Sequence, residues 1–143
     1  MSVNSLMGTF YHNIDVKGRM NFPTRMREIL GENFVITKGP DSCLFVYSLE
    51  GWAELEAKLN AQPLSKGRNI QRFFFAGAVE VEPDKQGRIN IPQHLREYAG
   101  LEKDVVVIGA SGRAEIWDKA KYDAANNQFS PDMLFEAMDE LGI

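Results

Sequence analysis

Two pairs of oppositely charged residues recur at one spacing in the sequence. Asp15 precedes Arg19 by four residues, and Asp84 precedes Arg88 by four. Positions 15 and 84 are 69 residues apart, as are positions 19 and 88. Arginine presents a planar fork of donors that binds carboxylates, phosphates or the edge of guanine, and a neighbouring carboxylate can hold that fork in place. The plainest interpretation is that each pair only staples a turn. The recurrence of the Asp–Arg pair favours a binding role, because a tight turn does not require an arginine directly after its glycine in both copies.

The residues around each pair predict the same local structure twice. Asp followed three residues later by Gly18 or Gly87 is typical of a tight turn, in which Asp accepts bonds from turn amides and Gly takes a positive φ that closes a hairpin. Residues 20–22 and 89–91 then alternate apolar, polar, apolar, which predicts short half-buried strands. A proline follows in both copies and starts a short helix. Each copy is therefore predicted as strand, turn, strand, proline and short helix.

The predicted fold class is mainly β with short helices (α+β). Each repeat is too small to bury its own core, so the halves are expected to interlock. Further strands are predicted at 34–37, 44–47, 105–108 and 114–117, and helices are predicted after Ser48, Asp118 and Ser130. The predicted division is a first module at 7–62, a connector helix at 63–76, a second module at 77–128 and an acidic C-terminal helix at 130–143. In the connector, Ile70, Phe73 and Phe74 are expected to be buried.

Composition predicts a cytoplasmic globular protein with an uneven charge distribution. The 143 residues are 44% hydrophobic and 25% charged, with no apolar run long enough for a membrane span and no signal peptide expected. The single cysteine, Cys43, is expected to be a buried small hydrophobe in a reducing compartment. The net charge is −4, and the segment 130–143 carries four acids and no base. The body is therefore neutral overall with local basic clusters, which is compatible with DNA binding. One cluster, Lys66, Arg68 and Arg72, has two open interpretations, solvated charge or phosphate contact.

Catalytic and metal-binding patterns are not found in the sequence. His12 and His94 occupy unmatched positions in the two halves, and no Cys or His stands at ligand spacing. There is no nucleophile elbow and no phosphate-cradling glycine loop. An enzyme, a metal site and a cofactor are therefore not expected.

These residues and motifs resemble the MraZ family of bacterial transcriptional regulators over nearly the whole chain. The resemblance is carried by YHNID at 11–15, KGR at 17–19, RFFFAGA at 72–78, and the block from DKQGR at 84–88 to LREYAGL at 95–101. It implies two tandem AbrB-like swapped-hairpin modules that form one interlocked pseudo-dimeric unit. It also implies a ring-shaped homo-oligomer that binds double-stranded DNA at direct repeats near the promoter of a cell-division and cell-wall gene cluster, in the cytoplasm and nucleoid. No membrane or small-molecule partner is implied.

The resemblance assigns the Asp-x-x-x-Arg motif as the element that reads DNA. The DNA-binding residues are then Asp15, Lys17, Arg19, Asp84, Lys85 and Arg88, and the phosphate contacts are Arg25, Arg27 and Arg96. The chain departs from the family pattern at Val16, Pro83, Asn21 and Asn90, and Lys17 aligns with Gln86 rather than with Lys85. An arginine fork can bond O6 and N7 of guanine in the major groove. The other basic side chains would bind phosphates and so fix the register of the protein on the duplex. Two alternatives remain: a homo-oligomeric scaffold ring without DNA readout, and an AbrB-like antitoxin, which would need a disordered partner-binding tail.

Overall fold

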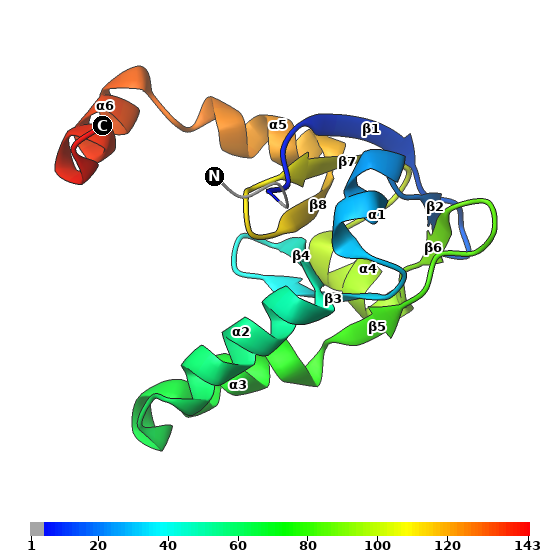
Figure 1. Ribbon diagram of the computed structural model, residues 1–143. Helices are drawn as coiled ribbons and strands as arrows, with labels where there is room; N and C mark the ends of the chain where they lie inside the picture. Colours follow the sequence, from blue (N-terminus) through cyan, green and yellow to red (C-terminus); the bar gives the residue numbers. More distant parts are fainter. Residues whose placement is uncertain (1–4) are drawn as a thin grey trace.

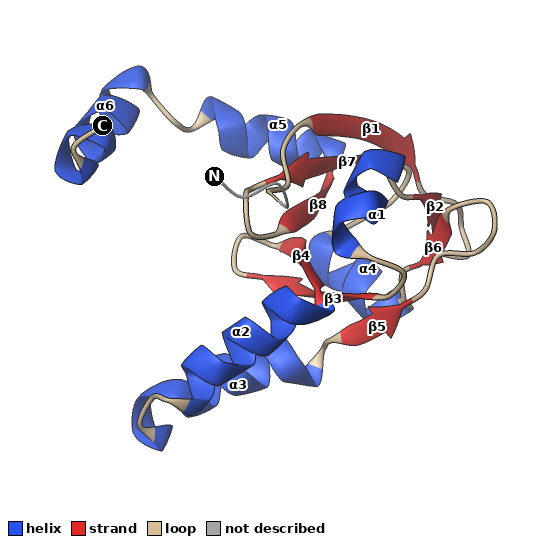
Figure 2. Cartoon of the chain, in the orientation of Figure 1, coloured by secondary structure: helices blue, strands red, loops and turns tan. Residues whose placement is uncertain are grey.

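The computed structural model describes residues 5–143, in which short strands alternate with short helices (Figures 1 and 2). The first half contains β1 (Thr9–Asn13), β2 (Arg19–Asn21), α1 (Thr24–Leu30), β3 (Phe34–Gly39), β4 (Cys43–Ser48) and α2 (Leu49–Asn60). Helix α3 (Leu64–Ala76) leads into the second half. The second half contains β5 (Val79–Val81), β6 (Arg88–Asn90), α4 (Gln93–Ala99), β7 (Asp104–Gly109), β8 (Ala114–Asp118), α5 (Lys119–Asn127) and α6 (Pro131–Leu141).

The strands form a six-stranded antiparallel sheet in the order β1-β7-β8-β4-β3-β5 and a two-stranded sheet, β2-β6. The larger order is symmetric about its centre, since β1, β3 and β4 of the first half correspond to β5, β7 and β8 of the second. The halves are therefore related by a local two-fold arrangement. This confirms the predicted α+β fold of two tandem AbrB-like modules in one interlocked unit.

Strand pairing shows how the halves interlock. The strand that enters each turn pairs with the other half: β1 lies on β7, with Tyr11 opposite Val106, and β5 lies on β3, with Glu80 opposite Val35. The strands that leave the turns, β2 and β6, pair with each other. The expectation that each turn closes a hairpin is right only for the turn itself, where the amide of Asp15 donates to the Arg19 carbonyl at 3.0 Å and the amide of Asp84 donates to the Arg88 carbonyl at 2.9 Å. Beyond the turns, strands β1, β2, β5 and β6 each pair with a strand of the other half.

Local signals in the sequence set the helix ends. The side chains of Ser48, Asp118 and Ser130 accept hydrogen bonds from the amides of Gly51, Lys121 and Met133, as expected of N-caps. Gly31 and Gly100 end α1 and α4 with positive φ, as predicted for C-terminal caps. These caps define short helices that can fit between strands.

One apolar core spans both halves. It includes Phe22 and Phe34, whose rings lie 5.2 Å apart, together with Ile91 and Leu95 from the second half. Helix α4 packs on β3 and β4, so apolar residues of the second half cover strands of the first. Burying each large apolar side chain contributes roughly 1.5–3 kcal/mol. The core is thus made of side chains from both halves.

Helices α2 and α3 form an antiparallel pair that extends from the sheet, and α6 lies apart from the body (Figure 1). In the connector, Phe73 and Phe74 are half-buried, but the expectation for Ile70 is wrong, because its side chain is 46% exposed. The helical spacing that suggested burial places Ile70 on the outer side of α3, where no described element covers it. No helix within residues 5–143 has the length and apolar character to cross a membrane. The division into units at 7–62, 63–76, 77–128 and 130–143 stays a prediction.

Candidate nucleic-acid interface

The two-stranded sheet is a narrow ribbon with one buried and one exposed face. Arg19 lies opposite Asn90, Met20 opposite Ile89, and Asn21 opposite Arg88. The Met20 and Ile89 side chains are both 2% exposed, so they anchor the ribbon to the core. Successive side chains of a strand point to opposite faces, and the flanking residues therefore face solvent. The ribbon, here called the β2–β6 ribbon, presents both predicted arginines on one outer face.

The first turn is built around the carboxylate of Asp15. Its Oδ1 accepts hydrogen bonds from the amides of Lys17 and Arg19, both at 2.9 Å. Its Oδ2 accepts from Nε of Arg19 at 3.0 Å. Gly18 has a φ of +88°, a conformation that glycine adopts with least strain. The carboxylate of Asp15 thus stabilises the turn and also holds the Nε end of the Arg19 guanidinium in place.

The second turn repeats these contacts. Oδ1 of Asp84 accepts from the amides of Gln86 and Arg88 at 2.9 Å, and its Oδ2 accepts from Nε of Arg88 at 3.0 Å. Gly87 has a φ of +79°. Gln86 takes the place of Lys17, which confirms that the two predicted lysines are not equivalent. Lys85 instead matches Val16, so a lysine stands at a different corner of each turn.

The terminal nitrogens of Arg19 and Arg88 are available to bind another molecule. Within residues 5–143, only Nε of each guanidinium donates to protein, and the terminal nitrogens make no hydrogen bond there. The Arg19 and Arg88 side chains are 43% and 39% exposed. Bonds from the amides of Arg19 and Arg88 are the main cause that lowers the pKa of Asp15 and of Asp84. Both acids therefore stay ionised near neutral pH and hold two oriented, charged forks.

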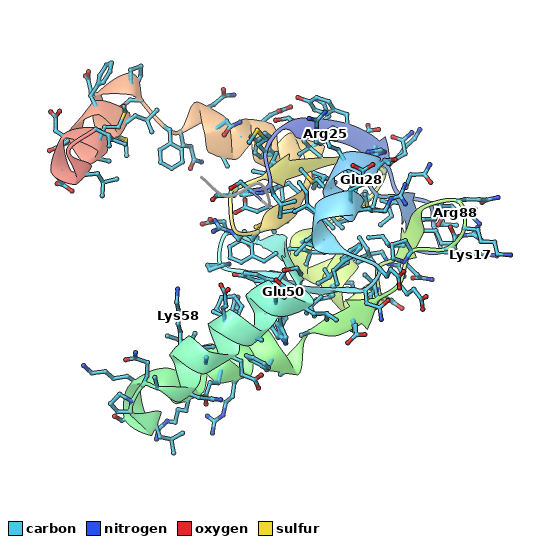
Figure 3. The ribbon with its side chains drawn as sticks, in the orientation of Figure 1. Lys17, Arg25, Glu28, Glu50, Lys58 and Arg88 are labelled. Atoms are coloured by element: carbon cyan, nitrogen blue, oxygen red, sulfur yellow. The ribbon has the colours of Figure 1, made fainter. Side chains whose placement is uncertain are left out.

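The lysines add positive charge at the same end of the molecule. Lys17 and Lys85 are exposed in the turns, and Figure 3 shows Lys17 and Arg88 projecting in the same direction. Each turn has two basic side chains and one acid. Acidic α6 lies at the far end of the molecule from the ribbon (Figure 1), so its negative charge is remote from this surface.

Two of the arginines predicted as phosphate contacts have structural partners. Arg27 of α1 donates from Nε to the Phe22 carbonyl at 3.1 Å. Arg96 of α4 donates from Nε to the Ile91 carbonyl at 2.9 Å and from Nη1 to the Val16 carbonyl at 3.3 Å. Arg96 therefore lies beneath the turn of the other half. Arg25 is exposed on α1 (Figure 3), and phosphate contact by these three arginines stays a prediction.

The fold thus brings all six predicted reading residues to the ends of one ribbon. It also places Asn21 and Asn90 on the same face, although no motif in the sequence assigned them a role. Their alternation with the buried Met20 and Ile89 was the available signal. The histidines lie elsewhere: burial lowers the pKa of His12, and His94 Nε2 lies 3.1 Å from the Gly77 carbonyl. In the described part of the chain, no cluster of His, Cys, Asp and Glu has the geometry to hold a metal.

Two interlocked swapped hairpins, each with an Asp–Arg turn on a shared ribbon, define a tandem AbrB-like protein. The family described as "MraZ protein, putative antitoxin-like" matches residues 5–71 and again residues 74–141, so the chain belongs to the MraZ family.

Curated relatives cover almost the whole chain. The transcriptional regulator MraZ of Acetivibrio thermocellus is 55% identical over 140 residues, which are 95% of this chain and 98% of the relative. The transcriptional regulator MraZ of Thermoanaerobacter sp. (strain X514) is 54% identical over 142 residues, which are 96% and 99%. That of Heliobacterium modesticaldum is 56% identical over 127 residues, which are 87% and 89%. These relatives are named as regulators of transcription and not as enzymes.

Proposed function

We propose that this protein represses transcription by binding double-stranded DNA sequence-specifically through the β2–β6 ribbon. The expected target is a set of direct repeats upstream of a bacterial cell-division and cell-wall gene cluster. The protein acts in the cytoplasm, on the nucleoid, as a ring-shaped homo-oligomer. Family membership supports regulation of transcription, and the contacts of the ribbon support DNA as the partner.

The observation that carries the proposal is that Arg19 and Arg88 make the same contacts in the two turns. Each fork is fixed at Nε by a carboxylate and exposes its terminal nitrogens. A side chain that is held before binding loses less conformational entropy when it binds. To hold the turn together, the aspartate and its bonds from the turn amides are sufficient. A purely structural role would not require, in both turns, an arginine whose terminal nitrogens have no hydrogen bond within the described residues.

The dimensions of the ribbon suit the major groove. That groove is about 12 Å wide and admits a two-stranded β-ribbon, in which arginine bonds O6 and N7 of guanine. Of the three nitrogens of each guanidinium, only Nε bonds the carboxylate of Asp15 or Asp84. The two terminal nitrogens of Arg19 and of Arg88 can therefore approach a base. Lys17, Lys85 and Arg25 are exposed, and in this proposal they bind phosphates beside the groove.

Assembly would multiply these contacts. Exposed apolar side chains on α6, among them Leu134 at 51% and Leu141 at 75%, supply surface for subunit contacts. In a ring, several ribbons would face repeated sites at once, and linked binding raises overall affinity without a new contact. The helical α6 also differs from the disordered tail that an antitoxin would need.

Equilibrium binding to the protein's own upstream DNA and to a scrambled duplex of equal length tests the proposal. At one salt concentration, Arg19→Ala and Arg88→Ala should each lose about 1–3 kcal/mol on specific DNA and little on scrambled DNA. Lys17→Ala should weaken both duplexes and lower the salt slope by about one. Lys58→Ala is the charge-matched control, because Lys58 lies on α2, far from the ribbon (Figure 3).

The scaffold alternative gives a different result in the same experiment. A ring without DNA readout would bind neither duplex in a salt-dependent manner. If the folded double variant Arg19→Ala/Arg88→Ala keeps the wild-type preference for specific DNA, the arginines only staple the turns and the proposed readout is wrong.

A further inference from the structure

We propose that Asn21 and Asn90 are additional base-reading residues, which recognise adenine beside the guanines bound by the arginines. This inference deepens the proposed function and rests on it. It concerns the outer face of the β2–β6 ribbon between its two turns.

The register places both asparagines within the arginine surface. Asn90 lies directly opposite Arg19, and Asn21 lies directly opposite Arg88. Directly opposite side chains in an antiparallel pair have Cβ atoms roughly 4.5–5.5 Å apart. The outer face therefore carries two Arg–Asn couples related by the local two-fold arrangement.

The ribbon continues beyond these couples as regular backbone. The amide of Phe22 donates to the Gly87 carbonyl at 3.0 Å, and the amide of Ile91 donates to the Gly18 carbonyl at 2.8 Å. Asn21 and Asn90 are thus held on both sides by ladder bonds. Their side chains stand on a rigid element, as residues that read base edges require.

Neither asparagine has a structural task in the described chain. Within residues 5–143, the side-chain amides of Asn21 and Asn90 make no hydrogen bond to protein, and both residues are exposed. Other asparagines do have partners: Asn33 donates to Glu80 at 3.1 Å, and Asn60 accepts from Gln71 at 3.2 Å. Asparagine is also depleted in strands, so propensity does not explain two of them on one short ribbon.

The amide group suits one base in particular. Asparagine accepts from N6 and donates to N7 of adenine in a bidentate pair, as arginine does with guanine O6 and N7. Arg19 and Asn21 are two residues apart on one strand, a span of roughly 6.6 Å, which is about two base-pair steps. The ribbon would then read a guanine and an adenine within about two base pairs of each other at each half of its footprint.

Base-analogue binding measurements test this assignment on the full-length protein. The specific duplex is prepared with 7-deazaadenine at one adenine at a time, which removes the N7 acceptor, and is compared with the unmodified duplex. Wild type should lose about 5- to 150-fold in affinity at one or more positions. Asn90→Ala or Asn21→Ala should lose a similar factor on unmodified DNA and little more on the modified duplex. Asn127→Ala, at an exposed position on α5 away from the ribbon, is the matched control.

The outcomes separate this inference from the proposed function. If wild type does not distinguish specific from scrambled DNA, the proposed function itself fails. If wild type is specific and the Asn21→Ala/Asn90→Ala double variant keeps the same specificity ratio, the asparagines do not read bases. Equal losses on specific and scrambled DNA would make them phosphate contacts and would also overturn the inference.

Discussion

Arg96 lies so close to Gly18 that a Cβ atom added at Gly18 would be 2.7 Å from its Nε. Arg27 has the same relation to Gly87, where an added Cβ would be 2.6 Å from Nη2. The helix arginine of each half therefore lies against the turn glycine of the other half. Arg96 also donates a hydrogen bond to the Val16 carbonyl in that turn, at 3.3 Å.

Replacing a turn glycine should damage both the turn and its support. Gly18→Ala places Cβ 2.5 Å from the Ile91 carbonyl oxygen and forces a non-glycine residue to a φ of +88°. We expect it to lower the free energy of unfolding by about 2–4 kcal/mol, from left-handed strain and overpacking. Chemical denaturation measures this loss. Gly112→Ala is the control, because no atom lies within 4 Å of its added Cβ, and an equal loss in both variants would contradict the argument.

Removing a supporting arginine should loosen the opposite turn. Arg96→Ala leaves the carbonyls of Ile91 and Val16 without their donor, and we expect a loss of about 1–3 kcal/mol of stability. Amide hydrogen exchange should quicken at residues 15–19, which belong to the other half, more than on α4 itself. Arg25→Ala is the control, since Arg25 is exposed. Unchanged exchange at residues 15–19 would show that Arg96 does not support that turn.

The repeat, the turns and the caps could be predicted from the sequence, because each depends on local chemistry at a fixed spacing. The pseudo-dimeric arrangement of swapped hairpins was implied by the resemblance to the MraZ family, and the residues alone predicted only that the two halves interlock. Aspartate and glycine specify the turn wherever they occur in this order. Alternation around Met20 and Ile89 identified the buried face of the ribbon.

Contacts between distant residues could not be predicted in the same way. The pairing of β1 with β7 depends on which partner buries more surface, and local pattern does not specify that choice. The position of Arg96 beneath Val16, 80 residues away, needs the assembled fold. Exposure of Ile70 likewise depends on what packs against α3, which helical periodicity does not reveal.

The two turn acids should make stability depend on pH in the acid range. The folded-state pKa of Asp15 and of Asp84 is lowered from 3.8, mainly by bonds from the Arg19 and Arg88 amides. A lowered pKa contributes stability above the unfolded value, and this contribution is lost as pH falls through the folded value. Asp15→Asn/Asp84→Asn should therefore lower the melting temperature near pH 6 and differ less from wild type below about pH 3. Glu136→Gln on exposed α6 is the control. A difference from wild type that is constant with pH would contradict the prediction.

The thiol of Cys43 should report on opening of the core. Cys43 is 0% exposed, and burial, with a smaller contribution from Glu115, raises the pKa of its thiol to about 12. The thiolate is the reactive form, so the native protein should label very slowly with a thiol reagent at pH 8. Unfolding in denaturant should release one reactive thiol per chain. Rapid, complete labelling of the native protein would show that the sheet opens at β4.

Separating the halves should remove the fold. A fragment of residues 1–62 lacks β5, β6, β7 and β8, which pair with β3, β2, β1 and β4. We expect this fragment to be unfolded, or to self-associate so that a second copy supplies the missing strands, because the local two-fold arrangement makes the halves interchangeable in form. Circular dichroism and sedimentation distinguish these states. Mixing it with residues 63–143 should restore a cooperative melt, since all cross-half strand pairs are then available. A monomeric fragment 1–62 that melts sharply by itself would show that the first half does not need the second.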